Sequence, residues 1–287
     1  MRRIKKCTVF LLVLCLLLNL AGCAAAQKPL RVTLVLKTVT EVAEFWGTLL
    51  SGVEKAAEEY GVELKVLTSP REIDIDKQIE LIRQVTADKP DVMILSAADY
   101  DRCAEATEEA IAAGIGVVAI DTDVNAAGRA CFVGSNSYEI GLEMGRAMAS
   151  YLPEGGKVAV IQHMLTTTTG IERTRGVLDA LNEAGNIEIL GSFCCDNSTE
   201  QAQTITTELL SADPEIRGFV CTNEVCNVGA ANALVELGMG GRVYVVGCDN
   251  SQRQIQFLEQ NIIQAIVTQR PFNMGYVAVQ QAVRVAN

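Results

Sequence analysis

The sequence predicts an α/β fold made of two doubly wound parallel-sheet lobes joined by a hinge. Short β-rich apolar runs alternate with longer segments of helical spacing, which is typical of a parallel sheet covered by helices on both faces. The same alternation begins again near residue 157, and the length of 287 residues suits one large or two medium domains. Together these observations favour two successive open α/β units.

The first unit opens with a β-rich run and a helix that carries Leu49, Leu50 and Val53 on one side. Gly61 stands where a helix C-cap glycine belongs. The strands expected in this unit are 30–36, 62–67, 91–96 and 116–120, and the helices are 45–60, 76–87 and 104–113.

The second unit repeats this alternation after a crossover expected near 134–137. Its expected strands are 157–162, 187–193, 218–221 and 243–246, and its helices are 172–184, 201–210 and 227–237, with 166–169 as a loop. We expect an N-terminal lobe of residues 30–135 plus 270–287, which includes a helix at 271–285, and a C-terminal lobe of residues 136–269.

The N-terminal segment has the pattern of a secretory signal peptide. A basic segment with Arg2, Arg3, Lys5 and Lys6 precedes an apolar run that is too short for a comfortable membrane span. The run ends in Leu20-Ala21-Gly22-Cys23, which resembles the lipobox of bacterial lipoproteins. That resemblance implies a signal peptide at 1–22, lipid on Cys23, a tether at 23–29 and an extracytoplasmic, membrane-anchored protein. The alternative is an uncleaved anchor with an incidental cysteine.

Acidic residues outnumber basic ones, and the formal net charge is −11. Removing the signal takes four cations away and makes the remaining chain more acidic. Nucleic-acid binding needs a basic face, so this composition argues against a nucleic-acid partner.

Seven cysteines follow Cys23, and most of them lie in or at the end of apolar runs, where cysteine acts as a small hydrophobe. We expect these thiols to stay reduced, because a disulfide framework is unusual in a domain of this size. The pairs Cys194/Cys195 and Cys221/Cys226 lack zinc-site spacing. We therefore expect neither a metal nor a cofactor.

An enzymatic interpretation rests on His163, the single histidine. No G-x-S-x-G motif accompanies it. We therefore expect a protein that is not an enzyme, and an exported hydrolase is the weakest alternative.

Carboxylates and amides gather after the predicted strands, where ligands bind in open α/β sheets. Phe45 stands there beside Trp46, the only tryptophan. Carboxylate acceptors, amides and a flat apolar ring suit a neutral polyhydroxylated ligand. For any single Asp or Asn, helix N-capping is the simpler explanation, but it explains five strand ends together less well.

The chain from residue 30 to 286 resembles the type I periplasmic sugar-binding proteins of ABC importers, and within them the ribose-binding branch. The features that carry the resemblance are Phe45-Trp46 with Gly52, the segment 114–121, Arg173 with Gly176, Asn223-Glu224 with Gly229-Ala230, the segment 245–249, and Gln269. The resemblance implies a sugar-like ligand and a membrane permease as partners. A receptor that signals to a kinase or chemoreceptor is the alternative.

The resemblance also implies a site. Phe45 and Trp46, on the first loop, are expected to sandwich the sugar, and Asp121, Asn223, Asp249 and Gln269 to bind its hydroxyls. Four further ligand positions depart from the ribose-binding pattern: Ser96, Thr122, Ile171 and Cys248. Because Thr122 and Ile171 replace arginines, we expect no guanidinium near the two aspartates and a ligand other than ribose.

Family chains normally continue beyond the helix at 271–285 into a third hinge crossing and a last strand. We expect this sequence to be a fragment, and the alternative is a hinge with two crossings.

Overall fold

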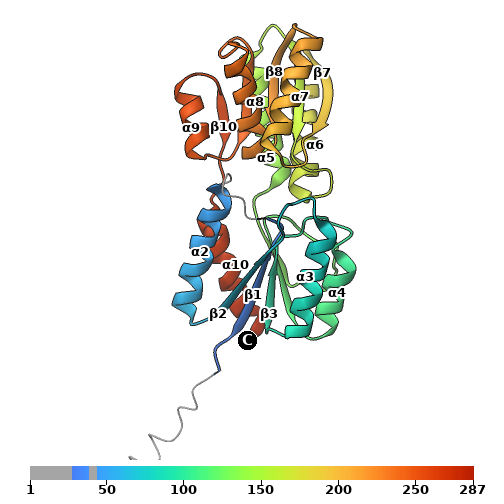
Figure 1. The fold of residues 1–287 in the computed structure, drawn as a ribbon, viewed down its shortest axis with the longest axis vertical. Coiled ribbons are helices and arrows are strands. Elements are labelled where there is room, and N and C mark those ends of the chain that lie inside the picture. Colours follow the sequence, from blue (N-terminus) through green and yellow to red (C-terminus); the bar gives the residue numbers. More distant parts are fainter. Residues whose placement is uncertain (1–27, 39–43) are drawn as a thin grey trace, which may run out of the picture.

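The computed structural model describes residues 28–38 and 44–287. It contains two five-stranded parallel sheets, each in a separate lobe (Figure 1). The predicted fold class is therefore confirmed. The proposed signal segment and Cys23 lie outside the described residues.

The N-terminal lobe holds the first sheet, in the order β2-β1-β3-β4-β5. Its strands are β1 (Arg31–Leu36), β2 (Glu63–Thr68), β3 (Val92–Leu95), β4 (Gly116–Ile120) and β5 (Cys131–Val133). The helices α2 (Glu44–Tyr60), α3 (Ile75–Asp88) and α4 (Ala104–Ala112) connect them. The helix α10 (Pro271–Ala286) returns from the far end of the chain to pack beside α2.

The central strands β1, β3 and β4 are buried on both faces because helices cover both sides of the sheet, and side chains alternate between those faces along each strand. Val32, Leu34 and Leu36 of β1 join the core under α2 and α10, and Val35 joins the core under α3 and α4. A strand that is buried on both faces appears in the sequence as a nearly continuous apolar run, and for this reason β1 could be predicted.

The C-terminal lobe holds the second sheet, in the order β10-β9-β8-β6-β7. Its strands are β6 (Gly156–Gln162), β7 (Ile187–Cys194), β8 (Ile216–Cys221), β9 (Tyr244–Cys248) and β10 (Ala265–Val267). Its helices are α5 (Ser137–Tyr151), α6 (Thr168–Ala184), α7 (Thr199–Ala212), α8 (Glu224–Glu236) and α9 (Gln252–Glu259). The chain passes between the lobes from β5 to α5 and from β10 to α10.

Glycines allow the helix pairs to approach closely. A Cβ on Gly52 of α2 would collide with the backbone oxygen of Phe272 in α10. In the other lobe, a Cβ on Gly141 of α5 would collide with the backbone oxygen of Arg173 in α6. The second contact fixes Arg173, a residue of the candidate site, at the place where the two helices meet.

Four elements were not among those predicted: β5, β10, α5 and α9. The two strands are only three residues long, and α5 carries glycines that lower helix propensity. The expected loop at 166–169 was partly wrong, because α6 already begins at Thr168, where the Thr167 side chain accepts a hydrogen bond from the Gly170 N–H.

Candidate functional site

A small pocket with a cavity volume of about 40 Å³ lies between the lobes, at the carboxyl ends of the strands of both sheets. The residues that line it are Lys37, Phe45, Trp46, Glu72, Asp121, His163, Thr169, Arg173, Asn197, Asn223, Glu224, Val225, Asp249 and Gln269. Residues from both lobes therefore face one another across the pocket.

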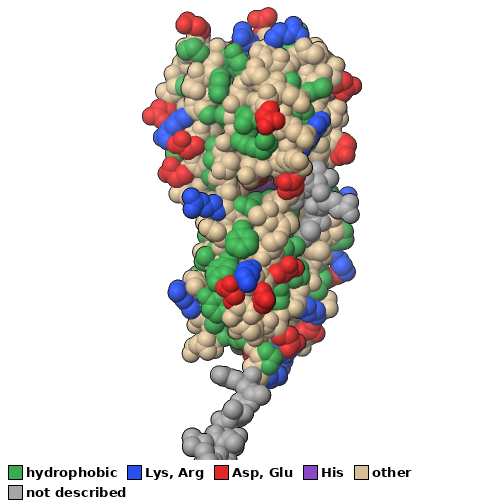
Figure 2. All heavy atoms as spheres, turned by 90° about the vertical axis from the view of Figure 1, so that its left-hand side faces the viewer, with side chains coloured by type: hydrophobic (Ala, Val, Ile, Leu, Met, Phe, Trp, Pro, Cys, Tyr) green, Lys and Arg blue, Asp and Glu red, His purple; other side chains and the backbone are tan. Residues whose placement is uncertain are grey.

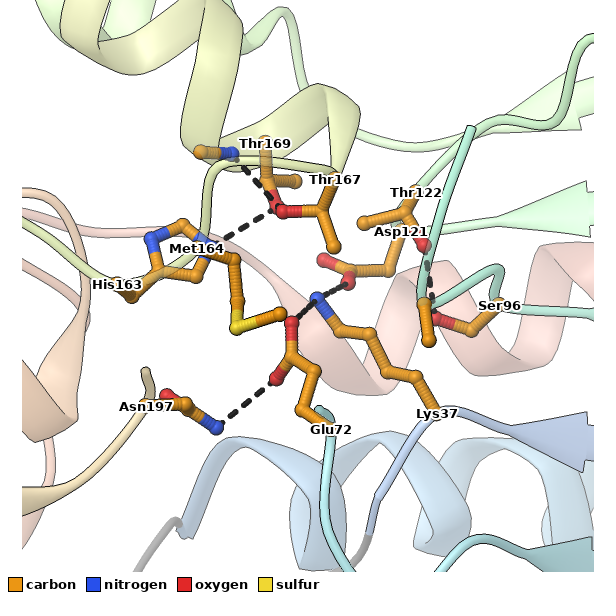
Figure 3. A network of polar contacts seen from close by, with 12 residues as sticks. Lys37, Glu72, Ser96, Asp121, Thr122, His163, Met164, Thr167, Thr169 and Asn197 are labelled. Atoms are coloured by element: carbon orange, nitrogen blue, oxygen red, sulfur yellow. Dashed lines mark hydrogen bonds and ion pairs between the residues drawn. The ribbon is translucent and has the colours of Figure 1, made fainter. Parts of the chain in front are cut away.

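A buried ion-pair network occupies the N-terminal side (Figure 3). The Lys37 Nζ lies 2.8 Å from Glu72 Oε1 and 3.4 Å from Asp121 Oδ2. Burial alone lowers the pKa of Lys37, but the two carboxylates outweigh it, so the pKa is raised and the ammonium stays charged. Lys37 also lies over the Trp46 ring, 5.7 Å from its centroid.

The C-terminal side places a neutral histidine opposite this cation. His163 is buried, and its Nδ1 lies 2.7 Å from the Thr222 hydroxyl while its Nε2 lies 3.2 Å from the Thr169 hydroxyl. Burial, together with the charges of Lys37 and Arg173, lowers the pKa of His163 well below its ordinary value. Two threonines hold this imidazole, so the described residues give it no Ser–Asp constellation.

Asp121 and Asp249 follow β4 and β9, and both adopt a left-handed backbone, with φ of 61° and 76°. Asp tolerates this conformation better than most residues. Their backbone N–H groups bond to the last residues of the neighbouring strands, Val133 and Val267, at 3.0 and 2.9 Å. Asp249 also accepts hydrogen bonds from the Gln269 amide at 2.8 Å and the Glu224 N–H at 3.1 Å.

Two charged side chains in the pocket keep buried polar atoms without a partner among the described residues. Arg173 donates from Nη1 to the Thr222 carbonyl at 2.8 Å, but its Nε is unpartnered. Glu224 accepts a 3.4 Å bond from the Glu44 N–H, but its Oε2 is unpartnered. Burial and the nearby Asp249 raise the pKa of Glu224 to about 7. Because such atoms are costly to leave unpaired, they are the natural places for ligand groups.

Hydrogen bonds join the lobes around the pocket. The Asn197 amide donates to Glu72 Oε2 at 2.9 Å, and the Tyr100 N–H donates to the Thr166 carbonyl at 3.0 Å. Asn223 in turn donates to the Asn197 oxygen at 2.9 Å. The described lobes are thus in direct contact.

Six of the ten residues expected to bind ligand line this pocket: Phe45, Trp46, Asp121, Asn223, Asp249 and Gln269. The other four lie elsewhere. Ser96 and Thr122 are fully buried and hydrogen-bond to each other at 3.2 Å, and Cys248, the last residue of β9, is buried in the core between the C-terminal sheet and the helices α5 and α6. Ile171 is 41% exposed and lines a separate groove near the crossover.

Two expectations about the neighbours of these residues were wrong. A cation does neutralise Asp121, because Lys37 reaches it from the end of β1, and a guanidinium, Arg173, lines the same pocket. The resemblance placed Phe45 and Trp46 on the first loop, but they lie in the first turn of α2, in agreement with the helix expected at 45–60. Trp46 is only 5% exposed and belongs to the core under α2, so it serves packing as well as the pocket.

Sequence reasoning missed Lys37, Glu72 and Thr169. Lys37 directly follows an apolar strand, and ligands bind near such positions in open α/β sheets. Glu72 carried no local signal, since a loop carboxylate is an ordinary surface pattern. Thr169 follows the predicted strand 157–162, but it lies in the run 166–169, which was expected to be simply a loop. His163, Asn197 and Glu224 also follow predicted strands, but none of them received a role as a ligand contact.

The fold and site describe a protein with two α/β lobes and a polar pocket between them. The periplasmic binding protein domain model matches residues 33–287, and the chain belongs to that family. The D-allose-binding periplasmic protein of Escherichia coli K12 is 26% identical over 268 residues, which is 91% of this chain and 84% of that protein.

Solved structures agree with this assignment. An Actinobacillus succinogenes solute-binding protein with bound D-allose has a TM-score of 0.82 at 27% identity, covering 91% of this chain and 92% of that chain. An Agrobacterium radiobacter carbohydrate-transporter solute-binding protein in complex with D-arabinose shares the fold, with a TM-score of 0.87 at 22% identity and coverage of 91% and 90%. These relatives are named as sugar-binding or transport proteins, not as enzymes.

Neither a membrane-spanning helix nor a metal-binding cluster occurs in the parts of the chain that the structure describes. No helix there combines the length and apolar character needed to cross a bilayer, and no group of three or more His, Cys, Asp or Glu side chains is placed to hold a metal ion.

Proposed function

We propose that this chain is an extracytoplasmic solute-binding lipoprotein that captures a neutral sugar between its lobes and delivers it to the membrane permease of an ABC importer. The observation that carries the proposal is the pair Asp121 and Asp249, which line one pocket from opposite lobes. A ligand that donates hydroxyls to both carboxylates holds the lobes together. Because such a ligand binds the closed form more tightly than the open form, it shifts the population toward the closed form.

The charges of the pocket favour a neutral ligand. Two cations, Lys37 and Arg173, face four acidic side chains, which are Glu72, Asp121, Asp249 and Glu224. An anionic ligand meets no excess of positive charge there. Carboxylates and amides suit ligand hydroxyls, and the Phe45 ring supplies an apolar face.

The charge pattern of the exterior argues against nucleic acid as a partner. The face in Figure 2 carries Lys and Arg side chains interspersed with Asp and Glu. No continuous basic stripe of the kind that binds nucleic acid appears on that face.

Within this class we propose an aldose of pentose or hexose size. The Escherichia coli relative is named for D-allose, and the Actinobacillus succinogenes protein holds D-allose. Arg173 and Glu224 have unpartnered buried atoms that can pair with ring or hydroxyl oxygens of such a sugar.

The N-terminal segment supports a lipid anchor. We propose a signal peptide at 1–22, lipid on Cys23 and a tether at 23–29, followed by the lobes 30–135 plus 270–287 and 136–269. Cys23→Ala should remove incorporation of a labelled fatty acid in cells, because no thiol remains to take the lipid. Persistent label on this variant would contradict the anchor without affecting the sugar-binding proposal.

A thermal-shift panel tests ligand capture. D-allose, D-ribose, D-arabinose, D-glucose and D-galactose should be compared with gluconate, an anionic control. A bound ligand at a hundredfold excess over Kd adds about 2.7 kcal/mol to the free energy of unfolding. We expect a shift with at least one neutral sugar and none with gluconate.

Intrinsic fluorescence gives an independent readout, because Trp46 is the only tryptophan and lines the pocket. Its emission should change with the sugar that shifts the unfolding temperature. A panel in which no sugar changes either signal, or only the anion does, argues against the proposed function.

A further inference from the structure

Two buried thiols lie directly behind the C-terminal wall of the pocket. Cys195 follows β7, and Cys226 lies in the first turn of α8. Their sulfur atoms are 3.4 Å apart, and both side chains are fully buried in the core of that lobe. Among the described residues all seven cysteines are free thiols.

This pair is coupled to the pocket through two asparagines. Asn197 stands two residues after Cys195, and its N–H donates to the His163 carbonyl at 2.8 Å. Asn223 stands three residues before Cys226, and its side-chain oxygen accepts from the Cys226 N–H at 3.0 Å. The two asparagines bond to each other at 2.9 Å, and Asn197 continues to Glu72 of the opposite lobe.

The surroundings distinguish Cys195 from the other thiols. The hydrogen bond with the Cys226 thiol lowers the pKa of Cys195, although burial opposes this. Burial raises the pKa of Cys103 and of the neighbouring Cys194 to about 11. Since the thiolate is the reactive form, Cys195 is the better nucleophile of these three.

We propose that Cys195 and Cys226 form a redox-active dithiol that hydrogen peroxide converts into a disulfide. The Cys195 thiolate attacks one peroxide oxygen, which forms a sulfenic acid and releases hydroxide. The Cys226 thiol then attacks the Cys195 sulfur, so that the S–S bond forms and water leaves. Overall two thiols are oxidised, one peroxide is reduced, and two waters are produced.

The two sulfur atoms need to approach each other only a short distance. A disulfide bond is about 2.05 Å long, so the sulfurs must approach by little more than one ångström. Hydrogen peroxide is close to water in size and reaches such sites through local opening of the structure.

The bond should weaken ligand capture. Closing the gap between the sulfurs shifts the segment that carries Asn197 or the first turn of α8, and either shift disturbs the Asn197–Glu72 hydrogen bond that joins the lobes. We expect a severalfold loss of sugar affinity on oxidation. This consequence rests on the proposed function, whereas formation of the disulfide does not.

Peptide mapping tests the modification. The purified protein is treated with hydrogen peroxide, remaining thiols are alkylated, and the digest is analysed by mass spectrometry without reduction. We expect a peptide that links Cys195 to Cys226 in the wild type and in Cys103→Ser, Cys194→Ser and Cys221→Ser. Full alkylation of both cysteines after treatment, or a link that uses Cys194 or Cys221 instead, overturns the proposal.

A second measurement tests the consequence. Sugar affinity is compared before and after peroxide treatment for the wild type and for Cys226→Ser, with circular dichroism to establish folding. The loss should occur in the wild type, reverse with dithiothreitol and be absent in the variant. If the linked peptide forms while affinity is unchanged, the coupling to the pocket is overturned. If Cys226→Ser does not fold, the reversal by dithiothreitol in the wild type decides the question alone.

Discussion

The two lobes have the same topology and different chemistry at the ends of their strands. Each sheet follows one order, with β1 to β5 in the N-terminal lobe matched by β6 to β10 in the C-terminal lobe. The helix α10 packs beside α2 as α5 packs beside α6. Even the hydrogen bonds after the strands repeat, because the Ser96 N–H bonds to the Val35 carbonyl as the Thr222 N–H bonds to the Ile161 carbonyl.

Equivalent positions nevertheless carry different groups. Lys37 follows β1 and His163 follows β6, so a cation in one lobe matches a neutral imidazole in the other. Asp121 is ion-paired with Lys37, whereas Asp249 accepts from an amide and a backbone N–H. Among the described residues, no ion pair within 4.0 Å joins Arg173 to a carboxylate.

The N-terminal lobe therefore supplies acceptors, Glu72 and Asp121, whose charge Lys37 compensates, whereas Asp249 in the C-terminal lobe accepts from neutral donors. We expect mutations at the first set to affect stability strongly. Mutations at the second set should affect ligand binding and the pH dependence of stability.

The largest effect should follow from removing the cation. Lys37→Met leaves Glu72 and Asp121 buried without their partner, which typically costs about 3–5 kcal/mol of unfolding free energy. His163→Leu, at the equivalent position, leaves only hydroxyls unpaired and should cost about 1–3 kcal/mol. Urea unfolding of both variants measures the difference.

A double variant isolates the ion pair. Lys37→Met combined with Glu72→Gln should lose less than the sum of the two single changes, because one uncompensated charge is gone. Equal losses for Lys37→Met and His163→Leu would show that the lobes do not differ as described.

The next largest effect is a pH dependence of the free energy of unfolding that is caused by Glu224. Burial and Asp249 raise its pKa from 4.5 to about 7 in the folded protein, so the unfolded chain releases this proton first as pH rises. The free energy of unfolding therefore falls between about pH 4.5 and 7, by roughly 3 kcal/mol from this group alone, and is constant above that range. Glu224→Gln should remove this fall and stabilise the protein at pH 8, but not at pH 4.5.

Urea unfolding across that pH range checks the expectation. Glu208→Gln on α7 is the matched control, because Glu208 is exposed and the change should not alter the pH profile. A Glu224→Gln profile parallel to that of the wild type would contradict the raised pKa.

The two aspartates should separate binding from stability. Asp121→Asn and Asp249→Asn each remove one charged acceptor, and each should weaken sugar binding by about 1.5–3 kcal/mol. Without ligand, Asp121→Asn should lower the unfolding midpoint because Lys37 loses a partner. Asp249→Asn should leave the midpoint unchanged or raise it, because repulsion with Glu224 is relieved.

Calorimetric titration and thermal unfolding of the two variants test this pair. Wild-type affinity in both would show that the sugar binds elsewhere. A lower midpoint in both variants would show that Asp249 is also held by a charge.

The sequence predicted the sheets better than it predicted the chemistry between them. Buried parallel strands such as β1 can be recognised in the sequence as apolar runs, whereas β5 and β10 are too short to be recognised in this way. Asp121 and Asp249 were predicted because strand ends in one fold class meet at one place. The partner of Asp121 was not predicted, because Lys37 reaches it only after β1 and β4 have been placed in one sheet.

The smallest effect concerns how a helix ends in each lobe. In the N-terminal lobe α3 ends at Lys89 in the left-handed conformation, with φ of 49°, and in the C-terminal lobe α6 ends at Gly185, with φ of 74°. A residue other than glycine costs about 1–2 kcal/mol in this conformation. Glycine avoids that cost, but it loses more conformational freedom on folding, which offsets part of the gain in stability. Lys89→Gly should therefore stabilise the protein by about 0.5 kcal/mol. Gly185→Ala should destabilise it by about 1 kcal/mol, and since a Cβ at Gly185 meets nothing within 4 Å, that loss is conformational and not steric. Urea unfolding of both variants measures these changes, and a loss of stability in Lys89→Gly would mean that the lysine side chain contributes more there than its backbone strain costs.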